Sequence, residues 1–381
     1  RIVDGRIMEA HNSSAMHEAT ETVPADLSSE KALRRLDAGV TNGVHAHRRA
    51  DVPRGLFQSG GSDSAAILAA AHKLGLPRPM TWTARFDTRK ADESADAAAL
   101  AASVGADHHV LTVTEAMVWS HLPAIVACMD DPAADYAIIP TWFLAQEARK
   151  DVTVILSGEG GDELFAGYGR YRRAMKPWWR GGRGPWRSGT FGRCVSGQGR
   201  QWRAGLAAME LSQRLTGLPA VQALDIAEWL PNDLLLKLDR CLMAHSAEGR
   251  TPLLDPVVAK AVWSLPDHFK VRDGYGKWLL RRWLQDALPQ AKPFAPKQGF
   301  TVPVGPWIEK QSQRLGPLVA QQSCIQDVMA PQKVERIFST ATQRGHARQA
   351  WTLLFYALWF RHHVEGIPAD GDVFETLSRA R

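Results

Sequence analysis

The sequence predicts an α/β fold whose central parallel sheet is covered by helices on both faces. Two observations carry this prediction. Short apolar segments alternate with helical segments of about 10–15 residues, which is typical of strand–helix–strand units. Glycine-rich loops follow two of the apolar segments, at residues 59–61 and 157–161. In parallel sheets, ligands bind beyond the carboxyl ends of the strands, so one site can use both loops.

The elements follow in a regular order. Residues 1–8 suggest a strand remnant that turns at Asp4-Gly5, and residues 29–46 suggest a helix with one apolar side. Strands are predicted at residues 55–58, 80–86, 109–113 and 152–156. Helices are predicted at residues 62–74, 92–104, 114–128 and 139–150. Beyond residue 206 the segments look helical, the last of them near residues 375–380, and no internal repeat is visible.

Composition indicates a globular protein. The 381 residues are 45% hydrophobic, enough for a sizeable core in one large or two interlocked domains. No run of about 18 apolar residues and no secretory signal is found, so we expect a cytoplasmic protein that contacts no membrane. The four cysteines form no C-x-x-C pair and are predicted to be reduced thiols. Residue 1 is Arg, which suggests a processed product or a fragment.

The charge distribution gives a weaker signal. The net charge of +6 suits an anionic substrate such as a nucleotide and is too small to indicate nucleic acid binding. Positive charge is concentrated in a basic segment, residues 167–205. This segment contains ten Lys and Arg residues and no Asp or Glu. Because tryptophans are interleaved, an RNA-binding role stays open. We favour a solvated, mobile insert.

The motif S-G-G-S-D-S at residues 59–64 predicts a phosphate-binding loop. Glycines let backbone N–H groups approach an anion closely, and the helix that follows adds partial positive charge. The loop lacks the lysine of the G-x-x-x-x-G-K-[ST] motif, so it is better suited to pyrophosphate than to transfer of a γ-phosphoryl group. The alternative is an ordinary turn between a strand and a helix.

A second loop, S-G-E-G-G-D-E-L-F-A-G-Y at residues 157–168, is rich in acids. Its carboxylates would repel phosphate unless a divalent cation lies between them, and Mg²⁺ favours carboxylate and phosphate oxygens. Asp63 and Asp162 are the predicted Mg²⁺ ligands. The alternative for both is helix capping.

Two further segments carry charge. Lys277, in G-Y-G-K-W-L-L-R-R at residues 274–282, is either a surface residue or a group that stabilises charge at an α-phosphate. Residues 236–255 mix charge with apolar positions, which predicts buried ion pairs because buried charge is costly when unpaired. This segment is expected to form an inter-domain brace or the wall of a substrate pocket.

Together these motifs resemble the synthetase domain of the glutamine-dependent asparagine synthetases. The resemblance covers about residues 30 to 360 in the family's order. The remaining matches are F-D-x-x-x-x-D-E-S at 86–94, D-H-H at 107–109, D-R-x-x-M-A-H-S-x-E-x-R at 239–250, G-K-x-L-L-R at 276–281 and P-K-Q-G-F at 296–300. The resemblance implies an ATP-pyrophosphatase domain at residues 31–365, with a five-stranded parallel sheet and a largely helical C-terminal extension. Residues 1–30 would form a connector before this domain, and residues 366–381 a tail after it.

The resemblance also implies a reaction and a set of residues. The side-chain carboxylate of aspartate attacks the α-phosphate of ATP, and ammonia then displaces AMP to give asparagine. Catalytic roles fall on Glu159, Asp162 and Lys277, with Asp63 and Asp162 on Mg²⁺ and Glu248 and Arg250 on the acceptor side. The implied ATP and pyrophosphate site comprises Gln58, Ser59, Gly60, Gly61, Asp63, Ser64, Ala84, Ser157 and Gly158.

Several positions depart from the family pattern, which leaves the acceptor acid open. They are Gln58, Ser62, Arg85, Gly249, Thr251 and Leu253. A tailoring amide ligase, such as a β-lactam synthetase or a lasso-peptide cyclase, therefore remains an alternative. Those β-lactam-forming relatives tend to carry tyrosine where this chain has Glu159, which favours ammonia. A non-catalytic nucleotide-binding relative is a further alternative, and the intact set of Asp63, Glu159, Asp162 and Lys277 argues against it.

Nothing in the chain resembles the family's glutaminase domain, which begins with a cysteine nucleophile. Free ammonia, or a glutaminase domain or subunit outside this chain, is the expected nitrogen source. We expect the pure polypeptide to release no glutamate from glutamine, and a glutaminase assay checks this.

Overall fold

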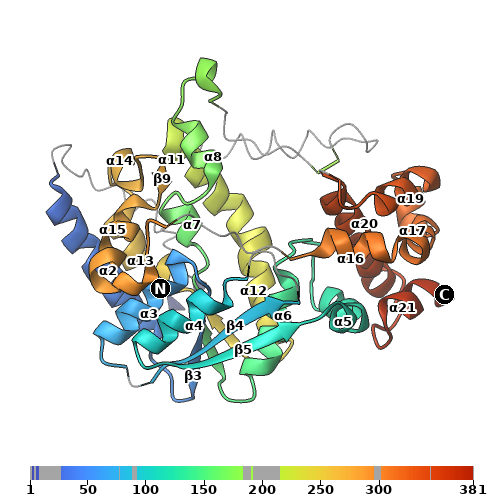
Figure 1. Ribbon diagram of the computed structural model, residues 1–381, viewed down its shortest axis with the longest axis horizontal. Coiled ribbons are helices and arrows are strands. Elements are labelled where there is room, and N and C mark those ends of the chain that lie inside the picture. Colours follow the sequence, from blue (N-terminus) through green and yellow to red (C-terminus); the bar gives the residue numbers. More distant parts are fainter. Residues whose placement is uncertain are drawn as a thin grey trace.

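The computed structural model describes residues 27–76, 78–87, 92–182, 190–191, 215–295, 302–343 and 345–380, and the backbone of residues 2–3 and 6–7. Its centre is a five-stranded sheet with the order β5-β4-β3-β6-β7, and every pair of neighbours is parallel. The predicted α/β class and the five-stranded parallel sheet are thereby confirmed (Figure 1). The strands are β3 (Arg54–Phe57), β4 (Met80–Phe86), β5 (Asp107–Val113), β6 (Val154–Leu156) and β7 (Glu248–Arg250).

The strand β7 was not predicted from residue patterns. Its sequence is Glu-Gly-Arg, without the apolar residues that mark the four other strands. It lies at the edge of the sheet beside β6, with Leu156 opposite Arg250. The N–H of Ser157 donates to the carbonyl oxygen of Arg250 at 2.8 Å, which continues the pairing into the acidic loop. Backbone pairing, and not burial of side chains, holds this strand.

The strand order places the two glycine-rich loops next to each other. The chain passes from β3 outward to β4 and β5, and then returns to the other side of β3 as β6. Leu56 and Leu156 are directly opposite in the register of β3 and β6. Both loops therefore leave the carboxyl edge of the sheet at the point where the strand order reverses, which is where α/β sheets bind ligands.

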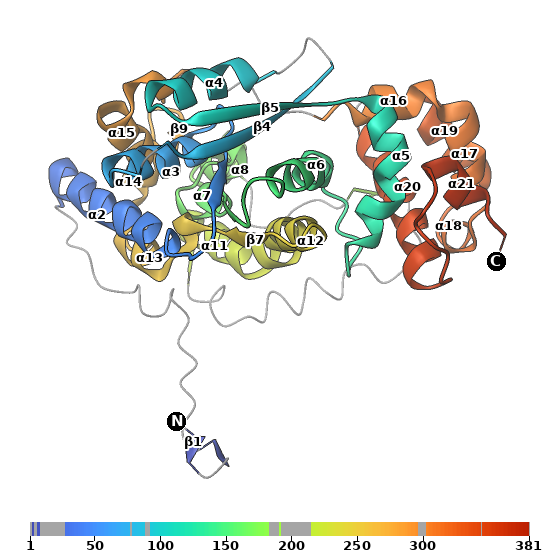
Figure 2. The same ribbon diagram turned by 90° about the horizontal axis from the view of Figure 1, so that it is seen from below.

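Helices cover both faces of the sheet, as predicted. One face carries α3 (Ser62–Lys73) and α4 (Ser94–Ser103), and the other carries α6 (Ile138–Ala148) and α12 (Leu236–Met243). Figure 2 shows α4 and α6 on opposite sides of β4 and β5. Residues 64–71 of α3 are all buried, because α2 (Ser29–His47) and α15 (Trp278–Ala287) pack against that helix from outside. The small alanines of α3 allow this close packing on all sides.

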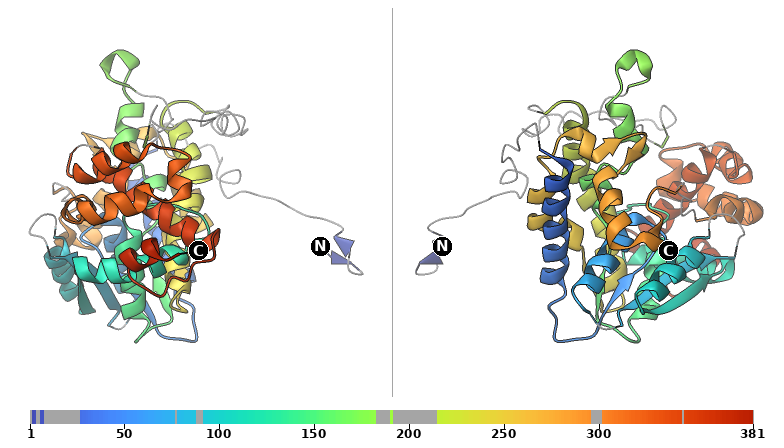
Figure 3. Two further views of the ribbon diagram at one scale, coloured as in Figure 1. Left: turned by 90° about the vertical axis from the view of Figure 1, so that its right-hand side faces the viewer. Right: turned by 60° about the vertical axis from the view of Figure 1, so that its left-hand side comes forward.

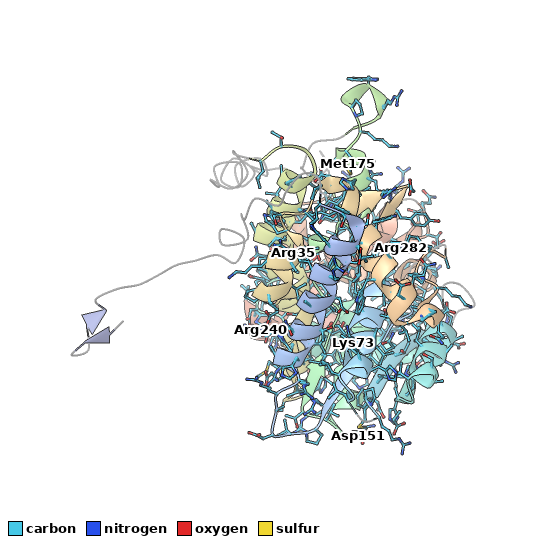
Figure 4. All side chains as sticks on the ribbon, turned by 90° about the vertical axis from the view of Figure 1, so that its left-hand side faces the viewer. Arg35, Lys73, Asp151, Met175, Arg240 and Arg282 are labelled. Carbon is cyan, nitrogen blue, oxygen red and sulfur yellow. The ribbon has the colours of Figure 1, made fainter. Side chains whose placement is uncertain are left out.

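Helix α2 runs along the outside of the molecule (Figure 3). Its Gly39 approaches α13 (Pro256–Val262) so closely that a Cβ there would lie 2.8 Å from the Cβ of Ala261. Asp37 of α2 accepts hydrogen bonds from Lys73 Nζ at 2.6 Å and Trp283 Nε1 at 2.8 Å. Figure 4 shows Arg35, Lys73 and Arg282 on this face, from α2, α3 and α15. The contacts bind α2 to the helices that flank the candidate site.

The C-terminal helices gather beside α5 (Glu115–Ala127) at one end of the molecule (Figures 1 and 3). They share one hydrophobic core with β4, α5 and α6. The last helix is held by a capping box in which Asp372 and Glu375 satisfy each other's backbone N–H groups. The helices are α16 (Val304–Lys310), α17 (Ser312–Ala320), α18 (Ser323–Gln326), α19 (Pro331–Ser339), α20 (His346–His363) and α21 (Val373–Ser378).

One long helix is built from three consecutive parts. Its first part is α11 (Gly217–Leu224), its middle, Asp225–Leu235, has π geometry, and it continues directly into α12. Segments of π-helix are rare and occur frequently at functional sites. The remaining elements are β1 (Ile2–Val3), β2 (Arg6–Ile7), α7 (Gly161–Leu164), α8 (Gly169–Ala174), η1 (Trp178–Arg180), η3 (Pro252–Leu254), α14 (Asp267–Lys270), β8 (Val271–Arg272), β9 (Tyr275–Gly276) and η4 (Pro289–Ala291).

Parts of four predicted features lie outside the described residues. They are most of the connector at residues 1–30, residues 88–91 of the F-D-x-x-x-x-D-E-S motif, the motif at 296–300, and residues 183–189 and 192–205 of the basic segment. Across the described part of the chain, no helix combines the length and the apolar character needed to cross a bilayer.

Candidate active site

The first loop holds its shape through its own hydrogen bonds. Ser64 Oγ, at the start of α3, accepts from the backbone N–H of Ser59 at 3.1 Å, and Gly61 N donates to Ser59 Oγ at 3.1 Å. The buried side chain of Gln58 donates from Nε2 to the carbonyl oxygen of Ser59 at 2.6 Å and to Ser64 Oγ at 3.2 Å. Serine hydroxyls and one amide thus fix the turn before the helix N-terminus.

The remaining predicted nucleotide-site residues surround this turn. A Cβ on Gly60 would lie 3.3 Å from Asp96 Cβ, so α4 closes one side of the loop. Ala84 is buried on β4, next to Thr83, whose hydroxyl donates to the carbonyl oxygen of Gln58. Ser157, also buried, follows β6 on the other side.

Glycines in the second loop make room for Asp63. A Cβ on Gly158 would lie 2.9 Å from Asp63 Cβ, and one on Gly161 would lie 2.4 Å from Asp63 Oδ1. Both contacts are too short for any other residue. Gly160 is restricted by its backbone, because its φ of 86° belongs to the left-handed region that favours glycine. The glycines of this loop therefore serve the packing of one loop against the other.

The ammonium group of Lys277 joins the two loops. Its Nζ donates to Asp63 Oδ2 and lies 2.7 Å from Asp162 Oδ1. Lys277 is 3% exposed, which excludes the alternative that it is a surface residue. Burial by itself lowers the pKa of Lys277, but the two carboxylates outweigh it and hold that pKa above its ordinary value. The three side chains form a charged centre at the carboxyl edge of the sheet, with the lysine buried and the two carboxylates partly buried.

Helix capping does not account for the two aspartates. The N-cap residue of α3 is Gly61 and that of α7 is Gly160, and neither helix has a side-chain cap. Asp63 and Asp162 stand in the first turns of these helices, where a negative charge is favoured by the helix dipole, and both carboxylates are aimed at one cation.

Local backbone geometry places Lys277 at this point. Lys277 has a φ of 56°, which is left-handed, and its N–H donates to the carbonyl oxygen of Phe165 at 3.1 Å. A Cβ on Gly276 would lie 2.4 Å from the carbonyl oxygen of Ala166, and one on Gly167 would lie 2.2 Å from Lys277 Cε. The hairpin of β8 and β9 is thus pressed against the second loop, and glycine is needed on both sides of the contact.

A second cation, Arg281, faces the same acids. It lies one helical turn after Lys277, and its Nε donates to the carbonyl oxygen of Gly276 at 2.9 Å. Burial lowers the pKa of Arg281, while Asp63 and Asp162 act on it in the opposite direction. Sequence reasoning gave Arg281 no role. The i,i+4 spacing from Lys277 is the signal that identifies it.

Two carboxylates at one cation also fit a divalent metal ion. Asp63 and Asp162 converge on a single ammonium, so they are close enough to share one ion. Among the described residues, no group of three or more His, Cys, Asp and Glu side chains could hold a metal by itself. Mg²⁺ is commonly bound by one or two carboxylates together with phosphate oxygens and water, which matches a pair of acids beside a phosphate-binding loop.

Glu159 lies at a separate ion cluster. Lys237 Nζ is 3.1 Å from Glu159 Oε1 and 3.1 Å from Asp135 Oδ2. Lys237 is 2% exposed, which confirms the buried ion pair predicted within residues 236–255. Neither Asp135 nor Lys237 was predicted as a site residue. Asp135 precedes α6, far from α12 in the sequence, and no motif links the two.

Glu248 and Arg250 pair with each other on β7. On β7, Arg250 Nε donates to Glu248 Oε1 at 2.7 Å. Arg250 Nη1 donates to the carbonyl oxygens of His47, at 2.9 Å, and Arg49, at 2.6 Å, at the end of α2. None of their described contacts reaches Glu159 or Lys277. Their acceptor-side role stays a prediction.

A buried chain of hydrogen bonds supports the second loop from behind. Gln222 Nε2 donates to the carbonyl oxygens of Glu163, at 2.7 Å, and Leu164, at 3.0 Å. Lys270 Nζ donates to Gln222 Oε1 at 3.2 Å and to the carbonyl oxygen of Trp263 at 2.8 Å. Burial lowers the pKa of Lys270 to about 8. Lys270 thus lies buried behind the loop that carries Asp162, and its hydrogen bonds within the described part of the chain go to an amide and a carbonyl oxygen.

We expect Lys270→Met to change how stability depends on pH. Because the pKa of Lys270 falls from 10.5 to about 8 on folding, the wild type gains stability as the pH rises from about 8 to 10.5. The variant lacks this gain, so its stability relative to the wild type should fall over that range. Urea denaturation at several pH values measures the difference. Lys150→Met, at an exposed lysine, serves as the control, and parallel stability curves for Lys270→Met and wild type would contradict the expectation.

Comparison with known proteins agrees with this geometry. A profile of the asparagine synthase family matches residues 35–361. The chain belongs to the asparagine synthase family. It is similar to asparagine synthetase [glutamine-hydrolyzing] 1 of Bacillus subtilis, with 29% identity over 90% of this chain and 61% of the relative. It is also similar to a putative asparagine synthetase [glutamine-hydrolyzing] of Mycobacterium tuberculosis (strain H37Rv), with 32% identity over 87% of this chain and 58% of the relative.

The chain therefore spans about three fifths of the length of these asparagine synthase relatives. Two of its departures from the family pattern have local explanations. Gly249 faces α12, where a Cβ would lie 2.7 Å from Leu242 Cδ1. Arg85 is exposed, and its Nε donates to Thr112 Oγ1 at 2.8 Å on the neighbouring strand. Neither residue contacts the centre formed by Asp63, Asp162 and Lys277 in its described interactions.

Proposed function

We propose that this protein is an ATP-dependent amide-forming ligase that adenylates the side-chain carboxylate of aspartate and transfers ammonia to it. A carboxylate oxygen attacks the α-phosphorus of ATP and pyrophosphate leaves. Ammonia then attacks the acyl carbon, the bond to AMP breaks, and asparagine and AMP are released. Membership of the asparagine synthase family and the names of the relatives support this reaction.

The observation that carries the proposal is the position of the Lys277 ammonium between Asp63 and Asp162. Cleavage between the first and second phosphorus of ATP builds charge on the α-phosphate and on the departing pyrophosphate. A fixed cation in a water-poor site stabilises such charge far better than a cation in water. Lys277, at the N-cap of α15, and Arg281, four residues later on that helix, supply two positive charges beside the phosphate-binding loop.

The other residues of the site would have separate roles. The loop of Ser59, Gly60, Gly61 and Ser64 would bind pyrophosphate through backbone N–H groups and hydroxyls at the start of α3. Asp63 and Asp162 would hold Mg²⁺, which supplies neutralising charge to the phosphate oxygens. When nucleotide is present, Lys277 would donate to the α-phosphate in place of its present carboxylate partners. Glu159 would orient the ammonia nucleophile and accept its proton.

Pyrophosphate release with separate candidate acids tests the proposal. With ATP, Mg²⁺ and aspartate, we expect release of pyrophosphate, and when ammonium is added we expect AMP and asparagine in amounts equal to the pyrophosphate. Glutamate and other carboxylic acids serve as comparisons, because the acceptor-side residues depart from the family pattern. Release with another acid but not with aspartate would replace the substrate and keep the reaction type. No release with any acid would overturn the proposal.

A further inference from the structure

The ion cluster at Glu159 carries more charge than one ion pair needs. Lys237 is fully buried, and its nitrogen contacts two carboxylates at the same distance of 3.1 Å. Burial by itself lowers the pKa of Lys237, but Glu159 and Asp135 outweigh it and raise that pKa, so the lysine is charged. Lys237 likewise outweighs the effect of burial on Asp135 and lowers the pKa of that acid.

The arrangement leaves a net negative charge where Glu159 lies. One ammonium between two carboxylates has a net charge of minus one. Two further groups act on the cluster with opposite signs, Asp233 on Lys237 and Arg348 on Asp135, so they do not change this balance. Both carboxylates are partly open to solvent, with 25% of the Glu159 side chain and 22% of the Asp135 side chain exposed, whereas the Lys237 side chain is 3% exposed.

We infer that Lys237 and Asp135 are positioning residues that hold the Glu159 carboxylate as an uncompensated negative charge, so that the nitrogen nucleophile is captured as a cation of the ammonium type. This inference rests on the proposed function. Without Asp135, Lys237 and Glu159 would form a neutral pair that offers a cation little attraction. Without Lys237, two neighbouring carboxylates would repel each other, and one of them would take up a proton. Removing either partner alone therefore changes the charge at Glu159.

The step that follows is balanced. An ammonium ion bound at Glu159 gives one proton to the carboxylate and becomes ammonia. The lone pair of ammonia forms the C–N bond to the acyl adenylate, and the C–O bond to AMP breaks. AMP leaves as an anion, and the second proton of the former ammonium passes to solvent. No oxidant, reductant or further reactant is required.

The test compares a charged nucleophile with an uncharged one. Ammonia is almost entirely ammonium near neutral pH, whereas hydroxylamine is largely uncharged and also captures acyl adenylates. With Lys237→Met we expect the KM for ammonium to rise about tenfold or more, the size expected when one partner of a buried charge pair is removed. Pyrophosphate release without amine, and capture of hydroxylamine, should stay within about twofold of the wild type. A role in structure alone would lower both captures together.

Two further variants separate charge from structure. Asp135→Asn leaves Lys237 and Glu159 as a neutral pair and should also raise the KM for ammonium. The double variant Lys237→Met with Asp135→Asn restores a single negative charge at Glu159, so it should capture ammonium better than Lys237→Met alone. Lys310→Met, at an exposed lysine that binds Glu115 at 2.8 Å, is the matched control and should behave as wild type.

The outcomes are distinct. Equal losses of ammonium and hydroxylamine capture in Lys237→Met, or a double variant no better than that single variant, would overturn the inference while pyrophosphate release upholds the proposed reaction. Absence of pyrophosphate release from the wild-type protein would overturn the proposed function itself, and the inference with it.

Discussion

Replacing Lys277 with alanine is expected to lower the rate of ATP-dependent pyrophosphate release by about 100- to 1,000-fold, the range seen when one preorganised stabilising group is removed. The lysine is buried between Asp63 and Asp162 and contacts both carboxylates. Without it, the charge that develops on the α-phosphate loses its nearest fixed cation. ATP binding should remain detectable, because the hydrogen-bonded loop at residues 59–64 is untouched.

Pre-steady-state pyrophosphate release and equilibrium ATP binding measure the two effects of Lys277→Ala separately. Lys150→Ala is the control, since Lys150 pairs with Glu147 on the surface. If the variant adenylates at the wild-type rate, the role given to Lys277 is wrong. If ATP binding is lost together with adenylation, Lys277 also binds ATP before the reaction and does not act on the transition state alone.

Gly167→Ala is expected to lower pyrophosphate release by about 100-fold, because small displacements of reacting groups have effects of that size. A Cβ at this position would lie 1.8 Å from Asp162 Oδ1 and 2.2 Å from Lys277 Cε. Real Cβ atoms do not approach other atoms so closely, so Asp162 or Lys277 must move. The variant therefore disturbs the charged centre without removing any charge.

Gly169→Ala provides a matched control only two residues away. A Cβ there would meet only Arg172 Nη2, at 3.5 Å, which is the far end of a flexible side chain. Pyrophosphate release and thermal stability should both stay close to wild type in this control. If Gly167→Ala is as active as Gly169→Ala, the contact between the second loop and Lys277 does not matter for the reaction.

Much of the fold was predictable from the sequence, because apolar strands, and glycines that end helices, are recognisable from a few neighbouring residues. The strands β3, β4, β5 and β6 lie within two residues of their predicted ends. The strand β7 was missed because Glu-Gly-Arg has no strand pattern, and it exists through backbone pairing with β6. The π geometry of Asp225–Leu235 was also missed, since a change of helix type leaves no clear mark on residue periodicity.

The candidate site was predictable in its parts but not in its pairings. Both loops, Asp63, Asp162 and Lys277 were identified, and the structure brings them together. The partners of Glu159 were not identified, because Lys237 and Asp135 meet only through the packing of α12 against α6. The contact of Arg250 with the end of α2 was missed for the same reason, since it joins residues 203 apart. Local patterns indicate which residues carry charge, and tertiary packing decides which charges meet.

An oxygen-18 transfer experiment tests the central claim most directly. Aspartate labelled with oxygen-18 in its side-chain carboxylate is incubated with ATP, Mg²⁺ and ammonium, and the products are analysed by mass spectrometry. If the carboxylate attacks the α-phosphorus, AMP gains one labelled oxygen and pyrophosphate gains none. Label in inorganic phosphate, or unlabelled AMP formed together with asparagine, would contradict attack at the α-phosphorus and with it the role of the Asp63, Asp162 and Lys277 centre.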